Sequence, residues 1–172
     1  LKSKGALILS CDEPDFIIVI GGDGTILAAE REYPSVPKIT FRKSDNGSKC
    51  MYSLDDFEKV IDKVLNNKFD IVEEQKLEIL PYNMLALNEV QLHNRLPTSA
   101  VRFSVEVDNI ILHKNVIGDG IIISTPFGSG GYFKSCGGGK FENFIGIILN
   151  NPYNVIRDWY TFSLNSKIHV EI

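Results

Sequence analysis

An aspartate stands in a bend that is otherwise almost bare of side chains. The segment FIIVIGGDGTIL carries an apolar run into Gly21, Gly22, Asp23, Gly24 and Thr25. Glycines let a ligand approach the backbone closely, and a strand-to-helix turn points N–H groups outward, a geometry that suits phosphate. Because a carboxylate repels phosphate, Asp23 is better suited to accept a proton from a hydroxyl or to help hold Mg²⁺.

The same bend has a purely structural interpretation. It could be a tight turn in which Asp23 caps the helix that follows. The segment matches neither GxxxxGK[ST] nor GxGxxG, so neither of these nucleotide-binding motifs decides the question. The bend by itself leaves both interpretations open.

A second stretch, GDGIIISTPFGSGGYFKSCGGG, joins a buried-strand run to a loop of glycines and hydroxyls. Gly128, Gly130 and Gly131 would let this loop lie close to a flat ligand. Tyr132 offers a ring to stack and a hydroxyl to hydrogen-bond. The structural alternative is a hairpin loop with a buried tyrosine, but a hairpin does not need so many glycines.

Between these stretches, the segment ALNEVQLHN places Asn88 and Glu89 side by side at the end of an apolar strand. An amide next to a carboxylate is a natural pair for base nitrogens and ribose hydroxyls. Alone, the pair would more simply be a polar strand end at the surface.

The elements that must position these residues change character along the chain. The apolar run 16–20 predicts a buried parallel strand, segment 25–33 a helix, segment 37–41 a second strand, and segment 53–67 a helix capped by Ser53. From residue 70 on, short β-rich runs alternate with polar turns, which predicts antiparallel strands. We therefore expect a Rossmann-like α/β unit with the GGDGT motif over residues 1–70, and an antiparallel, β-sandwich-like domain over residues 71–172.

The bulk composition excludes several classes of protein. The 172 residues carry a formal net charge of −4 and are 44% hydrophobic, which is typical of a soluble globular protein and argues against nucleic acid as the main partner. No apolar run approaches the roughly 20 residues of a membrane span. Cys11, Cys50 and Cys136 form no CxxC pair, which favours a reducing cytoplasm over a disulfide framework. The histidines lack metal-ligand spacing, so no protein metal cage is expected.

Taken in order, the stretches GGDGT, NE and GDGIIISTPFGSGGY resemble the NAD kinases that use ATP or polyphosphate. The motif GGDGT alone is shared with diacylglycerol and sphingosine kinases, whereas the NE pair combined with the long glycine loop is much more specific. The resemblance implies transfer of a phosphoryl group to the 2′-hydroxyl of the adenosine ribose of NAD, giving NADP. It also implies a divalent metal such as Mg²⁺ with ATP, and a homodimer or homotetramer.

The resemblance assigns a role to each motif. Asp23 matches the proton-accepting aspartate, and Gly22, Gly24 and Thr25 would lie beside the phosphates. Asn88 and Glu89 match the pair that holds the adenosine end of NAD. Asp119 matches the aspartate that contacts a base or carboxamide, and the loop residues that wrap the nucleotide are Gly130, Gly131, Tyr132 and Ser135.

The chain also departs from the family pattern. The family loop is usually STPTGSTAY, whereas this chain has STPFGSGGY, which loses hydroxyls and gains a bulky ring at Phe127. Family members usually have more chain at both ends. Two further functions therefore remain open: a lipid or sugar kinase that shares GGDGT, and a catalytically weak NAD(P)-binding protein.

Overall fold

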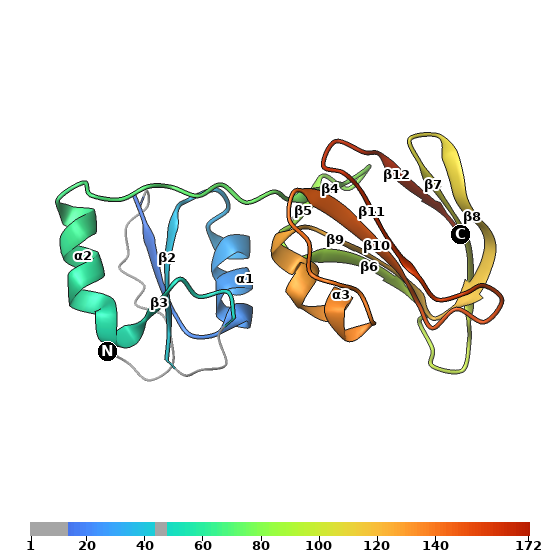
Figure 1. The fold of residues 1–172 in the computed structure, drawn as a ribbon, viewed down its shortest axis with the longest axis horizontal. Coiled ribbons are helices and arrows are strands. Elements are labelled where there is room, and N and C mark those ends of the chain that lie inside the picture. The colour runs from blue at the N-terminus through green and yellow to red at the C-terminus, as the bar shows by residue number, and fades with distance from the viewer. Residues whose placement is uncertain (1–13, 44–47) are drawn as a thin grey trace. The chain divides into compact units, whose positions relative to one another are not determined.

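The protein is described here from a computed structural model, which covers residues 14–43 and 48–172. Cys11 lies outside the described residues. The chain divides into two compact units, Leu1–Val72 and Glu73–Ile172 (Figure 1). Within the described ranges, no helix is long and apolar enough to cross a membrane.

The first unit is built on a parallel sheet. Its strands are β1 (Ile17–Ile20), β2 (Lys38–Arg42) and β3 (Tyr52–Ser53), in the order β1-β2-β3. Both pairings are parallel, so a crossover must connect β1 to β2, and helix α1 (Asp23–Glu32) provides it. The bend with the GGDGT motif thus lies at the carboxyl end of β1, the edge where open α/β sheets usually bind ligands.

Two further helical segments follow β3. They are the short 3₁₀ helix η1 (Leu54–Asp56) and helix α2 (Phe57–Leu65). Ser53 caps this segment as predicted, because its hydroxyl accepts a hydrogen bond from the N–H of Asp55 at 3.4 Å. Figure 1 shows α1 and α2 on opposite sides of the sheet. The face toward α2 is closed by a core that contains Ile39, Phe41 and Val60.

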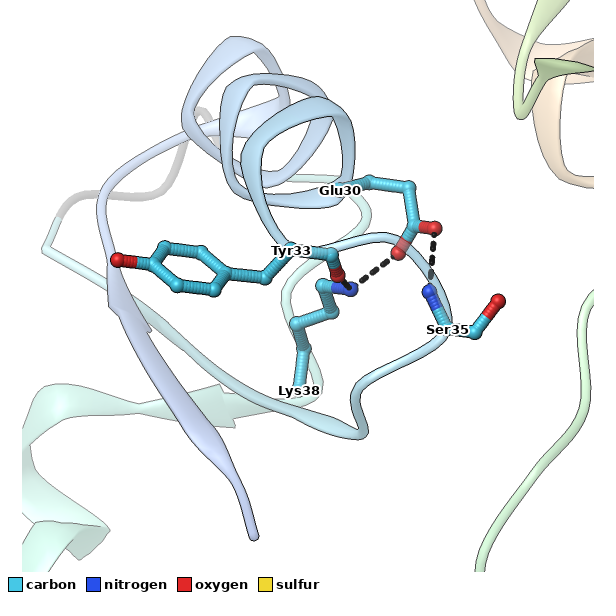
Figure 2. A network of polar contacts seen from close by, with 4 residues as sticks. All are labelled: Glu30, Tyr33, Ser35 and Lys38. Carbon is cyan, nitrogen blue, oxygen red and sulfur yellow. Dashed lines mark hydrogen bonds and ion pairs between the residues drawn. The ribbon is translucent and has the colours of Figure 1, made fainter. Parts of the chain in front are cut away.

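A polar network fixes the far end of α1 to β2 (Figure 2). The ammonium of Lys38 forms an ion pair with Glu30 and donates a hydrogen bond to the carbonyl of Tyr33. The second carboxylate oxygen of Glu30 accepts from the N–H of Ser35 at 3.2 Å. Ser35 has a φ of 66°, so the chain turns sharply there. These contacts hold the C-terminal end of α1 against the start of β2.

The second unit contains two larger antiparallel sheets and a hairpin. The four-stranded sheet has the order β11-β10-β9-β6, with strands β6 (Glu89–His93), β9 (Gly120–Ser124), β10 (Phe144–Asn150) and β11 (Trp159–Ser163). The three-stranded sheet has the order β12-β7-β8, with strands β7 (Val101–Val107), β8 (Ile110–Gly118) and β12 (Ile168–Glu171). The hairpin pairs β4 (Leu77–Ile79) with β5 (Met84–Ala86).

The four-stranded sheet is covered on both faces. On one face, Ile121 and Ile147 share a buried core with Val105 and Val116 of the three-stranded sheet, so these sheets form a sandwich. On the other face, Ile122 packs in a cluster with Phe133 and Cys136. That second cluster lies under the 3₁₀ helix η2 (Phe127–Gly130) and helix α3 (Tyr132–Ser135). The glycine loop that follows β9 is therefore packed against this sheet.

Several predicted boundaries were wrong. Helix α1 begins at Asp23, two positions before the predicted start. Residues 70–76 form no strand, and Asn88 and Glu89 do not end an apolar strand, because Asn88 lies between β5 and β6 and Glu89 begins β6. The loop predicted after residue 124 contains η2 and α3. The mixed α/β and β-rich character that the sequence predicted is confirmed.

Candidate functional site

Asp23 is the first residue of α1, and it does not cap the helix. The N-cap residue is Gly22, and no side chain makes a capping hydrogen bond there. The carboxylate of Asp23 instead accepts hydrogen bonds from the Ser48 hydroxyl at 2.8 Å and from the Lys49 N–H at 2.9 Å. The interpretation of Asp23 as a helix cap was therefore wrong.

The glycines of the bend provide space for an approaching group. A Cβ added at Gly22 or Gly24 would meet no heavy atom of the described residues within 4 Å. Neither glycine has a positive φ, so open access, and not unusual backbone geometry, explains these glycines. Gly21 differs, because a Cβ there would lie 2.3 Å from the hydroxyl oxygen of Thr25. The side chain of Thr25 thus packs against the bend.

The backbone of Asn88 is tied into the glycine loop. Its carbonyl accepts from the Thr125 N–H at 2.9 Å, and the Thr125 hydroxyl shares its one proton between the carbonyls of Leu87 at 2.6 Å and Asn88 at 3.0 Å. The same hydroxyl accepts from the N–H of Gly128 at 2.9 Å. A Cβ at Gly128 would lie 2.1 Å from the Asn88 carbonyl oxygen, so only glycine allows this close approach.

The side chains of Asn88 and Glu89 face the loop at Gly131. A Cβ added at Gly131 would lie 3.8 Å from both the Asn88 amide nitrogen and a Glu89 carboxylate oxygen. The Asn88 amide oxygen is buried and has no hydrogen-bond partner among the described residues. Native proteins leave few buried acceptors unsatisfied, so a donor from a bound molecule would fit here.

Tyr132 begins α3 and presents its ring outward. The side chain is 41% exposed, so the alternative of a hairpin loop with a buried tyrosine was wrong. Its hydroxyl accepts a hydrogen bond from the amide of Asn150 at 3.4 Å. The nearby Cys136 thiol, with burial second, raises the pKa of the Tyr132 hydroxyl above its usual value. The phenol therefore stays protonated near neutral pH and can donate a hydrogen bond.

Asp119 lies at the opposite end of β9 from Glu89. Its carboxylate accepts from the amide of Asn94 at 3.3 Å and from that of Asn151 at 3.1 Å. The next residue, Gly120, has a φ of 144°, and a Cβ there would lie 1.8 Å from the carbonyl oxygen of Leu92. Only glycine fits at that position, which explains the DG pair.

Other hydroxyls of the loop have structural partners. Ser135 is exposed, and its hydroxyl donates to the carbonyl of Tyr132 at 2.8 Å within α3. Buried Ser129 donates to the carbonyl of Pro126 at 2.7 Å. Gly130 ends η2 and is half-buried.

The predicted residues of the second unit span the length of one strand. Glu89 pairs with Ser124 at one end of β9, and Asp119 directly precedes its other end. Five residues of strand place these ends about 13 Å apart. The other predicted residues, 22–25, are consecutive and lie in the first unit. An extended ligand suits the second unit better than a single phosphate does.

Sequence reasoning missed several polar residues that surround the predicted ones. Ser48 and Lys49 lie in a turn-rich segment, where nothing indicated a contact with Asp23. Asn94 and Asn151, which hydrogen-bond Asp119, were missed too, although a carboxamide at the end of a strand can indicate a polar site. Arg157 donates to the carbonyl of Cys136 at the end of α3, a contact that no local pattern indicates.

The described side chains form no dedicated metal cage. No group of three or more His, Cys, Asp or Glu residues within 14–43 and 48–172 is arranged to hold an ion. Mg²⁺ is usually held by one or two carboxylates together with substrate phosphates. The single half-buried carboxylate of Asp23 suits that kind of shared coordination.

Comparison with known proteins matches both halves of the chain. Residues 87–154 match the family described as ATP-NAD kinase C-terminal domain. The chain is 31% identical over 170 residues to an NAD kinase of Borrelia garinii, an alignment that covers 89% of this chain and 60% of the relative. It is 36% identical over 131 residues to an NAD kinase of Thermotoga petrophila, covering 72% of this chain and 49% of the relative.

Solved structures show the same fold. An NAD kinase from Archaeoglobus fulgidus in complex with ATP aligns with a TM-score of 0.79 and 28% identity, over 91% of this chain and 64% of that one. Yeast NADH kinase complexed with NADH aligns with a TM-score of 0.80 and 22% identity, over 92% of this chain and 50% of that one. The chain thus spans about half to two thirds of the length of the proteins it matches here. By its motifs, its fold and these relatives, the chain is similar to NAD kinases over most of its length.

Proposed function

We propose that this chain transfers a phosphoryl group from ATP or polyphosphate to the 2′-hydroxyl of the adenosine ribose of NAD, giving NADP. Two observations carry the proposal: the Asn88 amide nitrogen and a Glu89 carboxylate oxygen both lie near Gly131, and the Asn88 amide oxygen is buried without a hydrogen-bond partner among the described residues. These residues lie within the range that matches the ATP-NAD kinase C-terminal domain.

Asp23 is the proposed base. A ribose hydroxyl is a poor nucleophile, so the transfer depends on positioning and on a group that takes its proton. The hydroxyl proton passes to the Asp23 carboxylate, the oxygen forms the new bond to the terminal phosphorus, and the bond to the leaving phosphate chain breaks. The donor then leaves as ADP or as a shortened polyphosphate.

The open glycines are proposed to receive the phosphates. Helix α1 begins at Asp23, and its first hydrogen bonds run from the N–H groups of Thr25 and Ile26 to the Gly22 carbonyl, so the N–H groups of Asp23 and Gly24 are the ones proposed to face a phosphate. Gly22 and Gly24 leave that helix end open. Anions are favoured at such an end. Thr25 would act by supporting the bend, because its side chain packs against Gly21 and its N–H donates to the Gly22 carbonyl at 3.0 Å.

The second unit is proposed to hold NAD. The Asn88 amide oxygen would accept from a base N–H, and Glu89 would accept from ribose hydroxyls. The exposed Tyr132 ring would stack on a flat part of the ligand, with Gly130 and Gly131 close beside it. Asp119, at the other end of β9, would accept from a second N–H donor such as a carboxamide. Ser135 would act through its position in α3, since its hydroxyl bonds within that helix.

A divalent metal is proposed to arrive with ATP. Asp23 is the carboxylate of the first unit's motif that could share such an ion with the substrate phosphates. When bound, Mg²⁺ would neutralise charge on those phosphates.

Further assignments follow from the family. We place the protein in the cytoplasm and expect a homodimer or homotetramer. The described cysteines, Cys50 and Cys136, are free and buried, which agrees with a reducing compartment. The relatives complexed with NADH and with ATP support NAD or NADH as acceptor and ATP as donor.

The test compares the wild-type chain with Asp23→Asn. With NAD, ATP and Mg²⁺, we expect the wild type to form NADP and the variant to lose turnover while keeping its affinity for NAD by calorimetry. Asp15→Asn is the matched control, because Asp15 is exposed in the same unit just before β1. Equal turnover in Asp23→Asn and wild type would refute the assigned base.

A second candidate has one observation in its favour. Ser48 and Lys49 already hydrogen-bond the Asp23 carboxylate, as a purely structural aspartate would be bonded. The chain would then be an NAD(P)-binding protein without turnover. It predicts tight NAD binding in both forms and NADP formation in neither.

A further inference from the structure

The segment 48–51 lies beside the bend that carries Asp23 and is hydrogen-bonded to it. The Ser48 hydroxyl donates to one Asp23 oxygen at 2.8 Å, and the Lys49 N–H donates to the other at 2.9 Å. Next along the chain, the Cys50 thiol donates to the carbonyl of Gly21 at 3.3 Å. The N–H of Met51 donates to the hydroxyl of Thr40 at 2.9 Å. Each of the four consecutive residues 48–51 thus donates a hydrogen bond within the first unit, and two of these bonds go to Asp23.

Donors on both oxygens fix the orientation of the Asp23 carboxylate. An ionised carboxylate has about four lone-pair sites, so two accepted hydrogen bonds leave sites for a further donor. The side chain can therefore be held in one orientation and still accept a proton from a substrate hydroxyl. Bonds of this kind to a charged group are stronger than neutral ones.

The two donors can be separated by mutation. Lys49 donates through its backbone, so no side-chain substitution removes that bond. Ser48 donates through its hydroxyl and is exposed, so its truncation leaves no buried cavity. A change at Ser48 therefore frees one oxygen of Asp23 with little effect on packing.

We propose that Ser48 is a positioning residue for Asp23. The inference rests on the proposed function, because it assumes that Asp23 is the base. Without the Ser48 hydroxyl, the carboxylate rotates about its one remaining bond and spends less time facing the acceptor hydroxyl. Such a loss lowers kcat and leaves KM for NAD unchanged, since Ser48 makes no proposed contact with NAD.

The test uses the full chain and measures kcat and KM for NAD separately. We expect Ser48→Ala to lower kcat about tenfold at unchanged KM, and Ser48→Thr, which keeps the hydroxyl, to restore most of it. The matched control is Ser53→Ala, which removes another serine–aspartate hydrogen bond in the same unit, that of Ser53 with Asp55 at 3.4 Å. That control should keep the wild-type kcat.

A double-mutant cycle decides whether Ser48 acts through Asp23. In the Asp23→Asn background, Ser48→Ala should cause no further loss of the residual rate. An unchanged kcat in Ser48→Ala, a loss confined to KM, or fully additive losses would overturn the inference while leaving the proposed function intact. Failure of the wild type to form NADP would instead overturn the proposed function and, with it, this inference.

Discussion

At the scale of single residues, chemically similar side chains have different tasks in this protein. The hydroxyl of Thr125 fixes the backbone of Asn88, and the hydroxyl of Ser129 fixes its own loop. The amide oxygen of Asn88 is buried and unsatisfied within the described chain. Leaving such a group without a partner costs about 1–3 kcal/mol. We infer that this cost is retained because a ligand satisfies the group.

This interpretation predicts opposite effects of one substitution on binding and stability. Asn88→Leu keeps the approximate shape and removes the unsatisfied oxygen. We expect KM for NAD to rise at least about tenfold, with the free energy of unfolding unchanged or raised. Steady-state kinetics and urea unfolding measure the two quantities.

Asn165→Ala is the control for Asn88, because Asn165 is exposed in a turn of the same unit. It should change neither KM nor the stability. If Asn88→Leu bound NAD as tightly as the wild type, the assigned role of Asn88 would be wrong.

His113 predicts how stability depends on pH. Burial lowers the pKa of His113 below its usual value of about 6.5, and its ring packs edge-on against Tyr160 with centroids 5.4 Å apart. The unfolded chain therefore takes up a proton at a higher pH than the folded chain does. This contribution to stability is complete above about pH 6.5 and is lost as the pH falls through the lowered pKa.

Urea unfolding at several pH values between 7.5 and 5 tests this prediction. We expect the loss of stability below about pH 6.5 to be smaller in His113→Phe than in the wild type. His169→Gln, at an exposed position in β12, should keep the wild-type pH dependence. Identical pH profiles for His113→Phe and wild type would contradict the assignment.

At the scale of elements, we expect a substitution at the start of α1 to change ATP binding without lowering the stability of the protein. Gly24 lies in the first turn of α1 with open space beside it. Gly24→Ala should leave the free energy of unfolding unchanged or raise it by at most about 1 kcal/mol, because alanine is the better helix residue. The added methyl group should raise KM for ATP, because it would lie where a phosphate approaches.

Gly138→Ala is the opposite case and serves as the comparison. Its Cβ would lie 2.1 Å from the ring of Phe133, in the cluster under α3. We expect a loss of about 1–3 kcal/mol in unfolding free energy from overpacking. Equal effects of the two glycine substitutions on stability would contradict the described packing.

Helix α3 depends on its neighbours because it has only four residues. Arg157 donates to the carbonyl of Cys136 at the carboxyl end of α3, where positive charge is favoured. We expect Arg157→Ala to weaken NAD binding several-fold, measured by calorimetry, since α3 carries Tyr132. Arg157→Lys should restore part of the affinity, and Arg102→Ala, at an exposed position in β7, should have no effect. Unchanged affinity in Arg157→Ala would show that α3 holds its position without this contact.

Sequence patterns predicted the regular elements well where burial is periodic. Helix α2 follows from apolar spacing, and strands β1, β2, β7, β8, β9 and β10 follow from short β-branched runs. Helix α3 could not be predicted, because four residues show no period and its position depends on packing against Ile122 and Ile148. Strands β11 and β12 were missed, although WYTFS and IHVE have strand-like composition.

The candidate site could be predicted as a set of residues but not as a set of contacts. The motifs named Asp23, Asn88 and Glu89, yet no local pattern links Ser48 to Asp23 or Gly131 to the Asn88–Glu89 pair. These contacts join residues that are 25 or more positions apart and exist only after the sheets form. Long-range pairing of this kind leaves no signature in a single sequence.

At the scale of the whole molecule, motifs with distinct chemistry lie in separate compact units. The proposed base is in the unit Leu1–Val72, and the proposed NAD-binding residues are in the unit Glu73–Ile172. The chain spans only part of the length of its relatives, so the central question is whether these 172 residues perform the reaction.

The most direct measurement is the identity of the product formed by the wild-type chain. NAD, Mg²⁺ and either ATP or polyphosphate are incubated with the protein, and phosphorus NMR locates the new phosphate. We predict NADP, with the phosphate on the 2′-hydroxyl of the adenosine ribose, for at least one donor. Absence of NADP with every donor, while calorimetry shows tight NAD binding, would contradict the kinase assignment and favour the binding protein.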